Sequence, residues 1–444
     1  MAKKKIIVGM STLSEIRESN AIYIDKTRFI DLLENDAGTK VPVFLRPRRF
    51  GKSLTASMLH SYYDIHEKDQ FKKNFKGTWI YDHRTPLASS YYVIHFDFSD
   101  VSSVSSEVND SFIRSVSYSI NSFSTKYPEQ GLPEEKRSIS SYSSATDLLG
   151  AFLDNFSNKA KEGEHLYVII DEYDHFANEI LTRDKEAFKD ITSTAAGHEG
   201  LIKRFYALLK KFYRGGSNGG IDRFFITGVS PVSLDSVTSG FNIATNISAE
   251  TEFDAMIGFT HDELSELIDE TVDFTQLPDD ITKERVIRIM EENYDGYAFN
   301  RYSNKTLFNS NLCLSYLRKL IAIKELPTPD EITLNDDAGK LNGMLSLCED
   351  DVREEIVRAM FTKEPIVTEL PERMNLNQTG SFDKEQMVSV LYHMGYLTVE
   401  PQLSRKLGGT SLVIPNKVYE NCFRLLPSVY GLQSGCKNGS ILHV

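Results

Sequence analysis

Short apolar runs rich in β-favouring residues recur through the first 260 residues, and longer segments with apolar residues at helical spacing separate them. The helical segments lie at 105–125, 145–160 and 199–213. The predicted strands are the runs at 40–45, 91–98, 165–170 and 223–228, with a weaker one at 253–259. Strands and helices that alternate at these intervals predict an α/β fold in which a parallel sheet lies between two helical layers.

The pattern of the second half is helical from residue 260 onwards. Thr260 and Glu263 match a capping box, which predicts that a helix begins at this point. The segment "ENYDGYAFN" (292–300) interrupts the helical pattern with aromatic residues and a glycine turn. Helical patterns at 350–361 and 383–394 precede two predicted strands joined by a turn within 395–416, an order typical of a winged helix.

Composition places the chain among ordinary globular proteins, with 444 residues, 41% hydrophobic and 25% charged. Four cysteines lie far apart without a C-x-x-C pair, which argues against a zinc site and favours a reducing compartment. The sequence has no apolar run near the roughly 20 residues that a membrane span needs. The N-terminus lacks the apolar centre of a signal peptide, so we expect a cytoplasmic protein without membrane partners.

The charge is distributed unevenly. The formal net charge of −13 disfavours a generally basic surface that coats nucleic acid. Residues 1–60 nevertheless contain 11 Lys and Arg against 6 Asp and Glu, a local balance of +5. This excess surrounds the sequence Gly51-Lys52-Ser53 and suits a polyanionic ligand, of which a triphosphate is the simplest.

The stretch "FLRPRRFGKS" (44–53) ends as a phosphate-binding loop does, although Arg46 stands where the motif has its first glycine. A strand precedes it and a helix follows, so backbone N–H groups at the helix start can face a phosphate. Lys52 would add a positive charge, and the hydroxyl of Ser53 would bind Mg²⁺. The residues predicted to contact the nucleotide are Arg48, Arg49, Phe50, Gly51, Lys52, Ser53 and Leu54. Arg48 and Arg49 could also be solvated loop charges or reach a neighbouring subunit.

A second motif supplies carboxylates. "LYVIIDEYD" ends a buried strand with Asp171, a predicted Mg²⁺ ligand, and Glu172, a predicted general base for the attacking water. The separation from Lys52 to Asp171 is 171 − 52 = 119 residues, which fits P-loop ATPases with an additional strand. Thr227 ends the next strand and is predicted to contact the γ-phosphate or the water as a sensor, with Asp97 a weaker candidate. ATP is preferred over GTP because the sequence has no N-K-x-D after that strand.

Together these motifs resemble the bacterial AAA-ATPase-like family, whose hallmark is an R-P-R-R-F-G-K-S form of Walker A. The matching stretches are "YIDKTRFIDLLE" (23–34), "FLRPRRFGKSLTASML" (44–59), "YVIIDEYD" (167–174), "FFITGVSPVSLDSVTSGFNIATNIS" (224–248) and "NYDGYAFN" (293–300). The resemblance implies that Lys52 and Ser53 bind phosphate and Mg²⁺, and that Asp171 and Glu172 form Walker B. It also implies that Tyr23, Asp25 and Lys26 lie before the nucleotide core, near the base.

The expected architecture has four parts: a P-loop NTPase core of three α/β/α layers with a parallel sheet of the additional-strand type, a helical lid, a winged-helix-like region and a flexible tail. Their predicted bounds are 1–259, 260–345, 346–428 and 429–444. Many members of the family carry a PD-(D/E)XK nuclease domain. No strand ending in Asp followed by an E-x-K strand occurs after residue 330, so nuclease activity is not predicted.

Two functions remain open from the sequence. The first is a Mg²⁺-dependent ATPase that acts as a nucleotide-driven switch, with low activity unless a homo-oligomer or partner protein supplies an arginine finger. For this function, family resemblance suggests a link to defence or mobile-element biology. The second is a non-hydrolysing, nucleotide-gated scaffold or a winged-helix module that binds double-stranded DNA. The intact set of Lys52, Asp171 and Glu172 favours the first.

Overall fold

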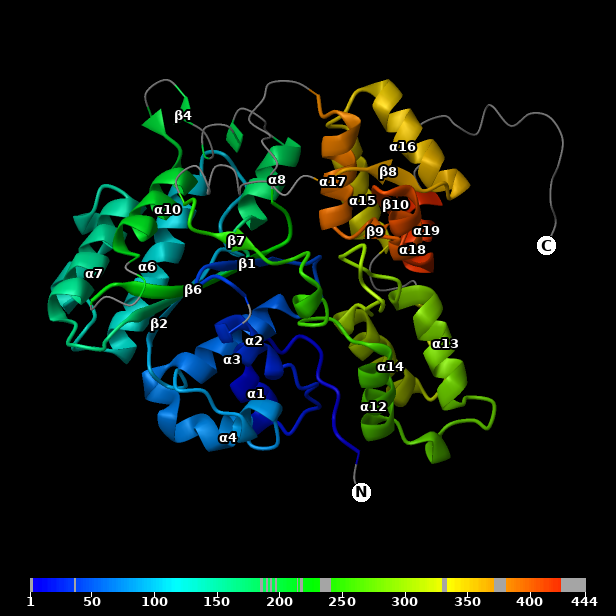
Figure 1. Cartoon of the computed structure of the whole chain (residues 1–444), viewed down its shortest axis with the longest axis horizontal. Helices are drawn as coiled ribbons and strands as arrows, with labels where there is room; N and C mark the ends of the chain where they lie inside the picture. Colours follow the sequence, from blue (N-terminus) through cyan, green and yellow to red (C-terminus); the bar gives the residue numbers. More distant parts are fainter. Residues whose placement is uncertain are drawn as a thin grey trace.

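A computed structural model of the chain is shown in Figure 1. The residues that it describes are 3–35, 37–183, 187–188, 191, 194–195, 198–213, 215, 219–231, 241–329, 334–370 and 381–424. The predicted flexible tail at 429–444 lies outside them.

A five-stranded parallel sheet forms the centre of the first half of the chain. Its strands are β1 (Pro42–Leu45), β2 (Tyr92–Asp97), β3 (Leu166–Asp171), β6 (Ile221–Gly228) and β7 (Thr245–Asn246), in the order β2-β3-β6-β1-β7. Ile226 of β6 pairs with Ile170 on one side and with Val43 on the other. Strand β6 therefore lies between the two strands that carry the phosphate-loop and carboxylate motifs. This order confirms the P-loop NTPase core with an additional strand.

Helices cover both faces of this sheet (Figure 1). Successive side chains of β2 point to opposite faces, as the period of a strand requires. The His95 ring approaches His60 of α3 (Lys52–Tyr63). The Phe96 ring instead meets Phe205 of α10 (Leu201–Phe212), next to α7 (Ala145–Lys159) and α6 (Val108–Lys126). The three-layer arrangement predicted from the alternating pattern is confirmed.

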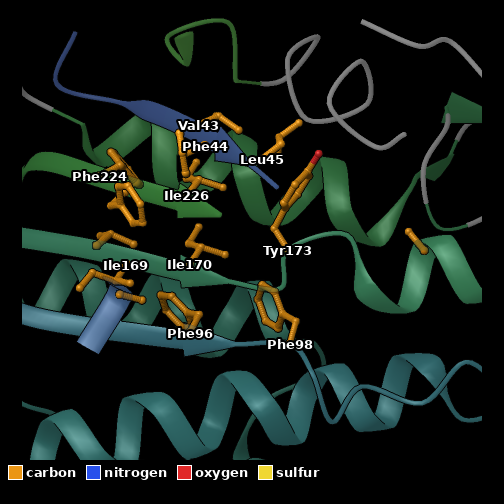
Figure 2. Packing of buried hydrophobic residues seen from close by; sticks show 14 of the residues in the cluster. Val43, Phe44, Leu45, Phe96, Phe98, Ile169, Ile170, Tyr173, Phe224 and Ile226 are labelled. Carbon is orange, nitrogen blue, oxygen red and sulfur yellow. The ribbon is translucent and has the colours of Figure 1, made fainter. Parts of the chain in front are cut away.

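The core of this sheet mixes aliphatic and aromatic side chains along the strands, such as Ile169 and Phe224, and continues beyond their carboxyl ends with Phe98 and Tyr173 (Figure 2). Every residue of β3 is buried, as expected for a strand with helices on both faces. Phe98, just beyond β2, stacks on Phe112 of α6 with 4.9 Å between ring centroids. Burial of each such side chain contributes about 2 kcal/mol, so the strand ends that carry the functional residues are fixed firmly.

The weak strand predicted at 253–259 is wrong. Residues Thr251–Phe253 form a 3-10 turn (η4), and the edge strand of the sheet is β7 instead. The apolar residues of this run, Phe253 and Met256 among them, are buried because the run packs as a loop. Gly258, with φ of +82°, ends the run where its N–H donates to the Phe50 carbonyl at 3.1 Å. Apolar content therefore reflected burial and not strand pairing.

The second half of the chain begins with α12 (His261–Thr271), α13 (Lys283–Tyr294) and α14 (Ser310–Ile323). The capping box of Thr260 and Glu263 at the start of α12 is confirmed. The remaining elements are α15 (Leu334–Leu345), α16 (Asp350–Thr362), β8 (Ile366–Thr368), α17 (Lys384–His393), β9 (Thr398–Val399), α18 (Pro401–Leu407), β10 (Thr410–Val413) and α19 (Lys417–Arg424). They lie together at the upper right of Figure 1.

The predicted pair of strands within 395–416 is only partly confirmed. Strands β9 and β10 do pair, in an antiparallel sheet of order β8-β10-β9. The connection between them is the helix α18 and not a turn, because Glu400 caps it and Pro401 occupies its first turn. The assignment of this region as winged-helix-like, and the four domain bounds, stay predictions.

Short helices, 3-10 turns and one pair of antiparallel strands complete the described residues. They are α1 (Leu13–Glu18), α2 (Arg28–Asn35), η1 (Ile65–Gln70), α4 (Phe71–Phe75), α5 (Trp79–Asp82), η2 (Glu134–Lys136), η3 (Ile139–Ser141), α8 (His175–Arg183), β4 (Thr194–Ala195), β5 (His198–Glu199) and η5 (Phe274–Gln276). Helices α1, α2 and α4 lie close to α3, on the lower side of the sheet in Figure 1.

Candidate nucleotide-binding site

The loop between β1 and α3 has the backbone shape of an anion site. Arg49 and Gly51 both have left-handed backbone conformations, with φ of +72° and +106°. Left-handed residues in a turn can direct backbone N–H groups toward an anion, and Gly51 is also the N-cap of α3, where a helix presents further free N–H groups. A non-glycine residue in this conformation is disfavoured, so Arg49 is held there by its surroundings.

Lys52 is buried at the centre of the loop, with only 4% of its surface exposed. Its Nζ donates to the carbonyls of Arg46 and Pro47, each at 3.2 Å. The same atom lies 3.5 Å from Oε1 of Glu172. The ammonium is thus enclosed by the loop on one side and faces the predicted general base on the other.

Asp171 lies at the end of β3, where its carboxylate accepts a hydrogen bond from the hydroxyl of Ser53. Burial raises the pKa of Asp171 to about 6, and the nearby Glu172 carboxylate adds to the rise, whereas the Ser53 hydrogen bond opposes it. On the neighbouring strand, Asp97 is paired with Asp171 in register. A buried carboxylate against a hydroxyl matches the oxygen ligands of Mg²⁺, which keeps several waters and uses few protein groups.

Glu172 has an unusual backbone and an unsatisfied side chain. Its φ is +50°, a left-handed conformation that its own N–H stabilises by donating to Asp171 Oδ1 at 2.9 Å. Its Oε2 is buried without a hydrogen-bond partner among the described residues. An unpartnered buried carboxylate oxygen is costly, and at a cavity wall it is suited to accept a proton from a bound water.

Lys52, Ser53 and Glu172 line one cavity of about 300 Å³, whereas Asp171 does not line it but is hydrogen-bonded to Ser53. Its polar end consists of the phosphate loop and Glu172. Its other end is mainly apolar and is built from the N-terminal segment, α3, α12 and α14; the side chains there include Ile7, Met10, Ile16, Ile22, Tyr23, Ile24, Met58, Ile257, Leu267 and Leu314. A charged end joined to an apolar one is the arrangement that a nucleotide requires.

Two of the predicted residues point elsewhere. The Thr227 hydroxyl is buried and donates to the Phe44 carbonyl at 2.8 Å, and Thr227 does not line the cavity. Arg48 extends to α8, where its Nη2 lies 3.2 Å from Nδ1 of His175 and 3.8 Å from Glu179. The phosphate and sensor roles of Arg48 and Thr227 therefore stay predictions. Gly51, Ser53, Leu54 and Arg49 do line the cavity.

Arg46, which occupies the position of the first glycine, is a structural anchor. It is 1% exposed, and its guanidinium lies 4.3 Å from the centre of the Phe44 ring and 4.0 Å from that of Phe299. Its Nη1 donates to the carbonyls of Leu45 and Ser248 at 2.9 and 2.7 Å. Burial lowers the pKa of Arg46 to about 10, so it remains charged at neutral pH. Arginine therefore replaces glycine because this position is packed against distant segments.

The start of α14 forms another wall of the loop, which sequence reasoning missed. Ser310 Oγ donates to the Phe50 carbonyl at 2.9 Å, and the Asn311 N–H donates to the Arg49 carbonyl at 3.1 Å. The Phe50 ring packs edge-on against Tyr297, with 4.9 Å between centroids. A polar N-S-N run before a helix looks like ordinary capping, so nothing local in the sequence identifies these contacts.

Of the three residues expected near the base, two line the cavity and one does not. Tyr23 and Lys26 line the cavity, whereas Asp25 accepts the backbone N–H groups of Thr27 and Trp79 and does not line it. The Lys26 ammonium is held by both carboxylate oxygens of Glu263 at 2.7 Å. Burial lowers the pKa of Lys26, and the Glu263 carboxylate opposes that effect.

Comparison with known proteins agrees with this geometry. The model of a family described as Predicted AAA-ATPase matches residues 7–238, just over half of the chain and the whole of the loop and carboxylate motifs. The chain belongs to the predicted AAA-ATPase family. This confirms the resemblance drawn from the R-P-R-R-F-G-K-S loop, and the first-glycine position of this AAA-ATPase-like chain is occupied by the buried Arg46.

Two individual proteins are similar to this AAA-ATPase-like chain. An uncharacterized protein from the vnfD 5′ region of Azotobacter chroococcum mcd 1 is 27% identical over 272 residues, which are 60% of this chain and 45% of that protein. The chain therefore matches less than half of that relative's length. A solved structure, the Walker-type ATPase paby2304 of Pyrococcus abyssi, is 13% identical with a TM-score of 0.47, over 90% of this chain and 94% of that one.

Two absences apply to the residues that the structure describes. Among them, no helix combines the length and apolar character needed to cross a membrane. Within the same residues, no cluster of three or more His, Cys, Asp or Glu side chains is arranged to bind a metal ion. A Mg²⁺ ion here would depend on the nucleotide and water for most of its ligands.

Proposed function

We propose that this AAA-ATPase-like chain binds ATP with Mg²⁺ and hydrolyses it. The observation that carries this proposal is that Lys52, Ser53 and Glu172 line a single cavity and that Asp171 is hydrogen-bonded to Ser53, although 119 residues separate Lys52 from Asp171. Family membership supports nucleotide binding at this loop. The unpartnered Oε2 of Glu172 supports hydrolysis over binding alone, because a scaffold has no need for a buried general base.

Each residue has a separate role in this proposal. The backbone N–H groups after Arg49 and the Lys52 ammonium hold the β- and γ-phosphates. Ser53 and Asp171 would hold the Mg²⁺ ion, which neutralises phosphate charge when bound. Glu172 orients the attacking water and accepts its proton. The Asp171 carboxylate, protonated in part near pH 6, loses its proton to serve as a ligand.

The apolar end of the cavity would hold the adenine base. Side chains of Ile22, Ile24 and Met58 provide flat apolar contact, and Tyr23 adds an aromatic wall whose hydroxyl lies 3.4 Å from the Met58 sulfur. Because the N-terminal segment and α14 both contribute to this end, a bound nucleotide would touch the core and the second half of the chain together.

A switch role follows from the packing around the loop. Phe50 contacts Tyr297, and Arg46 contacts Phe299. The segment between these two aromatic residues is bonded to the C-terminal region, because the Val399 N–H donates to the Ala298 carbonyl at 3.2 Å. Phosphate competes with the loop carbonyls for Lys52, so its binding would alter the loop that supports these contacts. We propose that the C-terminal region responds to the nucleotide state by this route.

Nucleotide-dependent melting tests the proposal. ATP with Mg²⁺ should raise the melting temperature of the wild type more than GTP does, and Lys52→Ala should abolish the rise. Lys40→Ala is the matched control, since this lysine precedes β1, bonds Asp222 at 2.6 Å and does not line the cavity. An unchanged ATP response in Lys52→Ala would refute binding at this loop, and absence of phosphate release from the wild type would refute hydrolysis.

A further inference from the structure

The residues directly after Glu172 are fixed by an unusually dense polar contact. Asp174 is fully buried, and its carboxylate accepts the N–H of Val229 at 3.0 Å and that of Ser230 at 2.6 Å. The side-chain amide of Asn178, one turn along α8, donates to the same carboxylate at 2.5 Å. Val229 and Ser230 are the first residues beyond β6, so a carboxyl group buried beside Walker B holds the end of the neighbouring strand.

Two further hydrogen bonds close this contact. The Tyr173 hydroxyl donates to the Ser230 carbonyl at 2.5 Å, and Ser230 Oγ donates to Asn178 Oδ1 at 2.7 Å. The Tyr173 N–H also donates to the Thr227 carbonyl at 3.2 Å. We call Tyr173, Asp174, Asn178 and Ser230 the strand-end clamp. Every polar group of the clamp named here is paired within it or with the end of β6.

The fit at the end of β6 leaves no room for a side chain. A Cβ atom added to Gly228 would lie 2.2 Å from Asp174 Oδ1 and 2.4 Å from the Tyr173 ring. Gly228 at the end of β6 therefore packs directly against Tyr173 and Asp174, the residues that follow Glu172.

Glu172 lies between two fixed points. On one side, Asp171 belongs to β3 and bonds Ser53 of the phosphate loop. On the other side, Tyr173 and Asp174 are bound to the end of β6. A left-handed conformation at a glutamate, here φ of +50°, persists only where the surrounding structure enforces it. The left-handed turn also directs the Glu172 side chain toward Lys52 and the cavity.

We infer that Asp174, together with Tyr173 and Asn178, is a positioning residue for Glu172: the strand-end clamp holds the general base in its strained conformation and ties it to the strand that carries Thr227. None of the four clamp residues lines the cavity, so the clamp acts on the water-activating step and not on nucleotide affinity. This inference rests on the proposed ATP hydrolysis.

The test compares the full-length wild type with Asp174→Asn, Tyr173→Phe and a control. Asn at 174 keeps the size of the side chain but replaces one acceptor oxygen with a donor, which then faces the N–H groups of Val229 and Ser230. Asp222→Asn is the matched control, because Asp222 is also buried on β6 but lies at its opposite end, bonded to Lys40 and Tyr91 at 2.6 Å each. Melting temperature, ATP-dependent stabilisation, KM and kcat are measured for each.

Asp174→Asn should lower kcat about 100-fold, with KM and the ATP-dependent rise in melting temperature unchanged within about threefold. Tyr173→Phe, which keeps the ring and removes one hydrogen bond, should lower kcat by a smaller factor, about tenfold, and it remains informative if Asp174→Asn does not fold. Asp222→Asn should lower the melting temperature and leave kcat within about twofold of the wild type.

Two results overturn the inference in different ways. Equal kcat in Tyr173→Phe and the wild type, or a loss in Asp174→Asn no larger than in Asp222→Asn, removes the positioning role and leaves the proposed ATPase intact. A wild type that binds ATP and releases no phosphate removes the proposed hydrolysis, and the inference falls with it.

Discussion

The guanidinium of Arg46 lies 4.0 Å from the centre of the Phe299 ring, across 253 residues of sequence (299 − 46). This contact joins the first residue of the phosphate loop to the segment that leads into the C-terminal region. It explains why a loop that lacks its first glycine still has the shape of an anion site. The motif alone suggests that glycine at position 46 would improve the loop, whereas these contacts predict that Arg46→Gly destabilises the protein.

Restoring glycine at this position should damage the protein. Arg46→Gly removes two buried hydrogen bonds and two ring contacts and leaves a cavity, at a cost of about 3 kcal/mol. Thermal melting should show a clear loss of stability and a weaker response to ATP. Arg48→Gly is the control, since that side chain is 36% exposed and contributes less. Tighter ATP binding by Arg46→Gly would show that the loop needs glycine after all.

Glu172→Gln should separate binding from hydrolysis. The amide cannot accept the proton of the attacking water, so kcat should fall about 100- to 10,000-fold while ATP still stabilises the protein. Phosphate release and ATP-dependent melting measure the two effects. Glu179→Gln, an acid on α8 that bonds Arg48 outside the cavity wall, should keep its turnover. Equal phosphate release from Glu172→Gln and the wild type would remove the general-base role.

Gly395 provides a test of the link to the C-terminal region. It has φ of +86°, and a Cβ added there would lie 2.8 Å from the Cβ of Pro47 in the phosphate loop. Gly395→Ala should therefore displace this contact and weaken any ATP-induced change in hydrogen exchange across 384–424. Gly408→Ala is matched in backbone strain, with φ of +74°, but its Cβ would meet nothing within 4 Å. If both variants respond to ATP as the wild type does, the signal does not pass through Pro47.

Acid should destabilise the protein through two partly buried histidines. Burial, with the nearby Arg46 charge, lowers the pKa of His393 to about 3, and burial lowers that of His95 to about 4. Below pH 6.5 these two histidines bind protons in the unfolded chain but stay neutral in the folded protein. The free energy of unfolding therefore falls as pH decreases. The limit is about 1.4 kcal/mol per pH unit for each histidine.

Denaturant unfolding at pH 7 and pH 5 measures this loss. His393→Gln should reduce the difference between the two pH values, because glutamine takes up no proton in either state. His83→Gln is the control, since His83 is exposed and stacks on Trp79. An undiminished pH dependence in His393→Gln would show that His393 is not the source of the effect.

The sequence predicted those parts of the candidate site that are written in short, local motifs. The alternating strands and helices, Gly51-Lys52-Ser53 and the pair Asp171–Glu172 needed only spacing, because parallel strands bring their carboxyl ends together. The buried run at 253–259 was mistaken for a strand, since apolar content records burial and not hydrogen bonding. The role of Arg46 depends on Ser248 and Phe299, more than 200 residues away, and no single-sequence pattern contains that information.

Because Ser310 and Asn311 complete the wall around the loop, two distant stretches of the chain build the candidate binding site. Any truncated product that ends before α14 would carry both Walker sequences but would lack this wall of the site. Recognising those sequences in a fragment is therefore no guarantee that the fragment can hold its ligand.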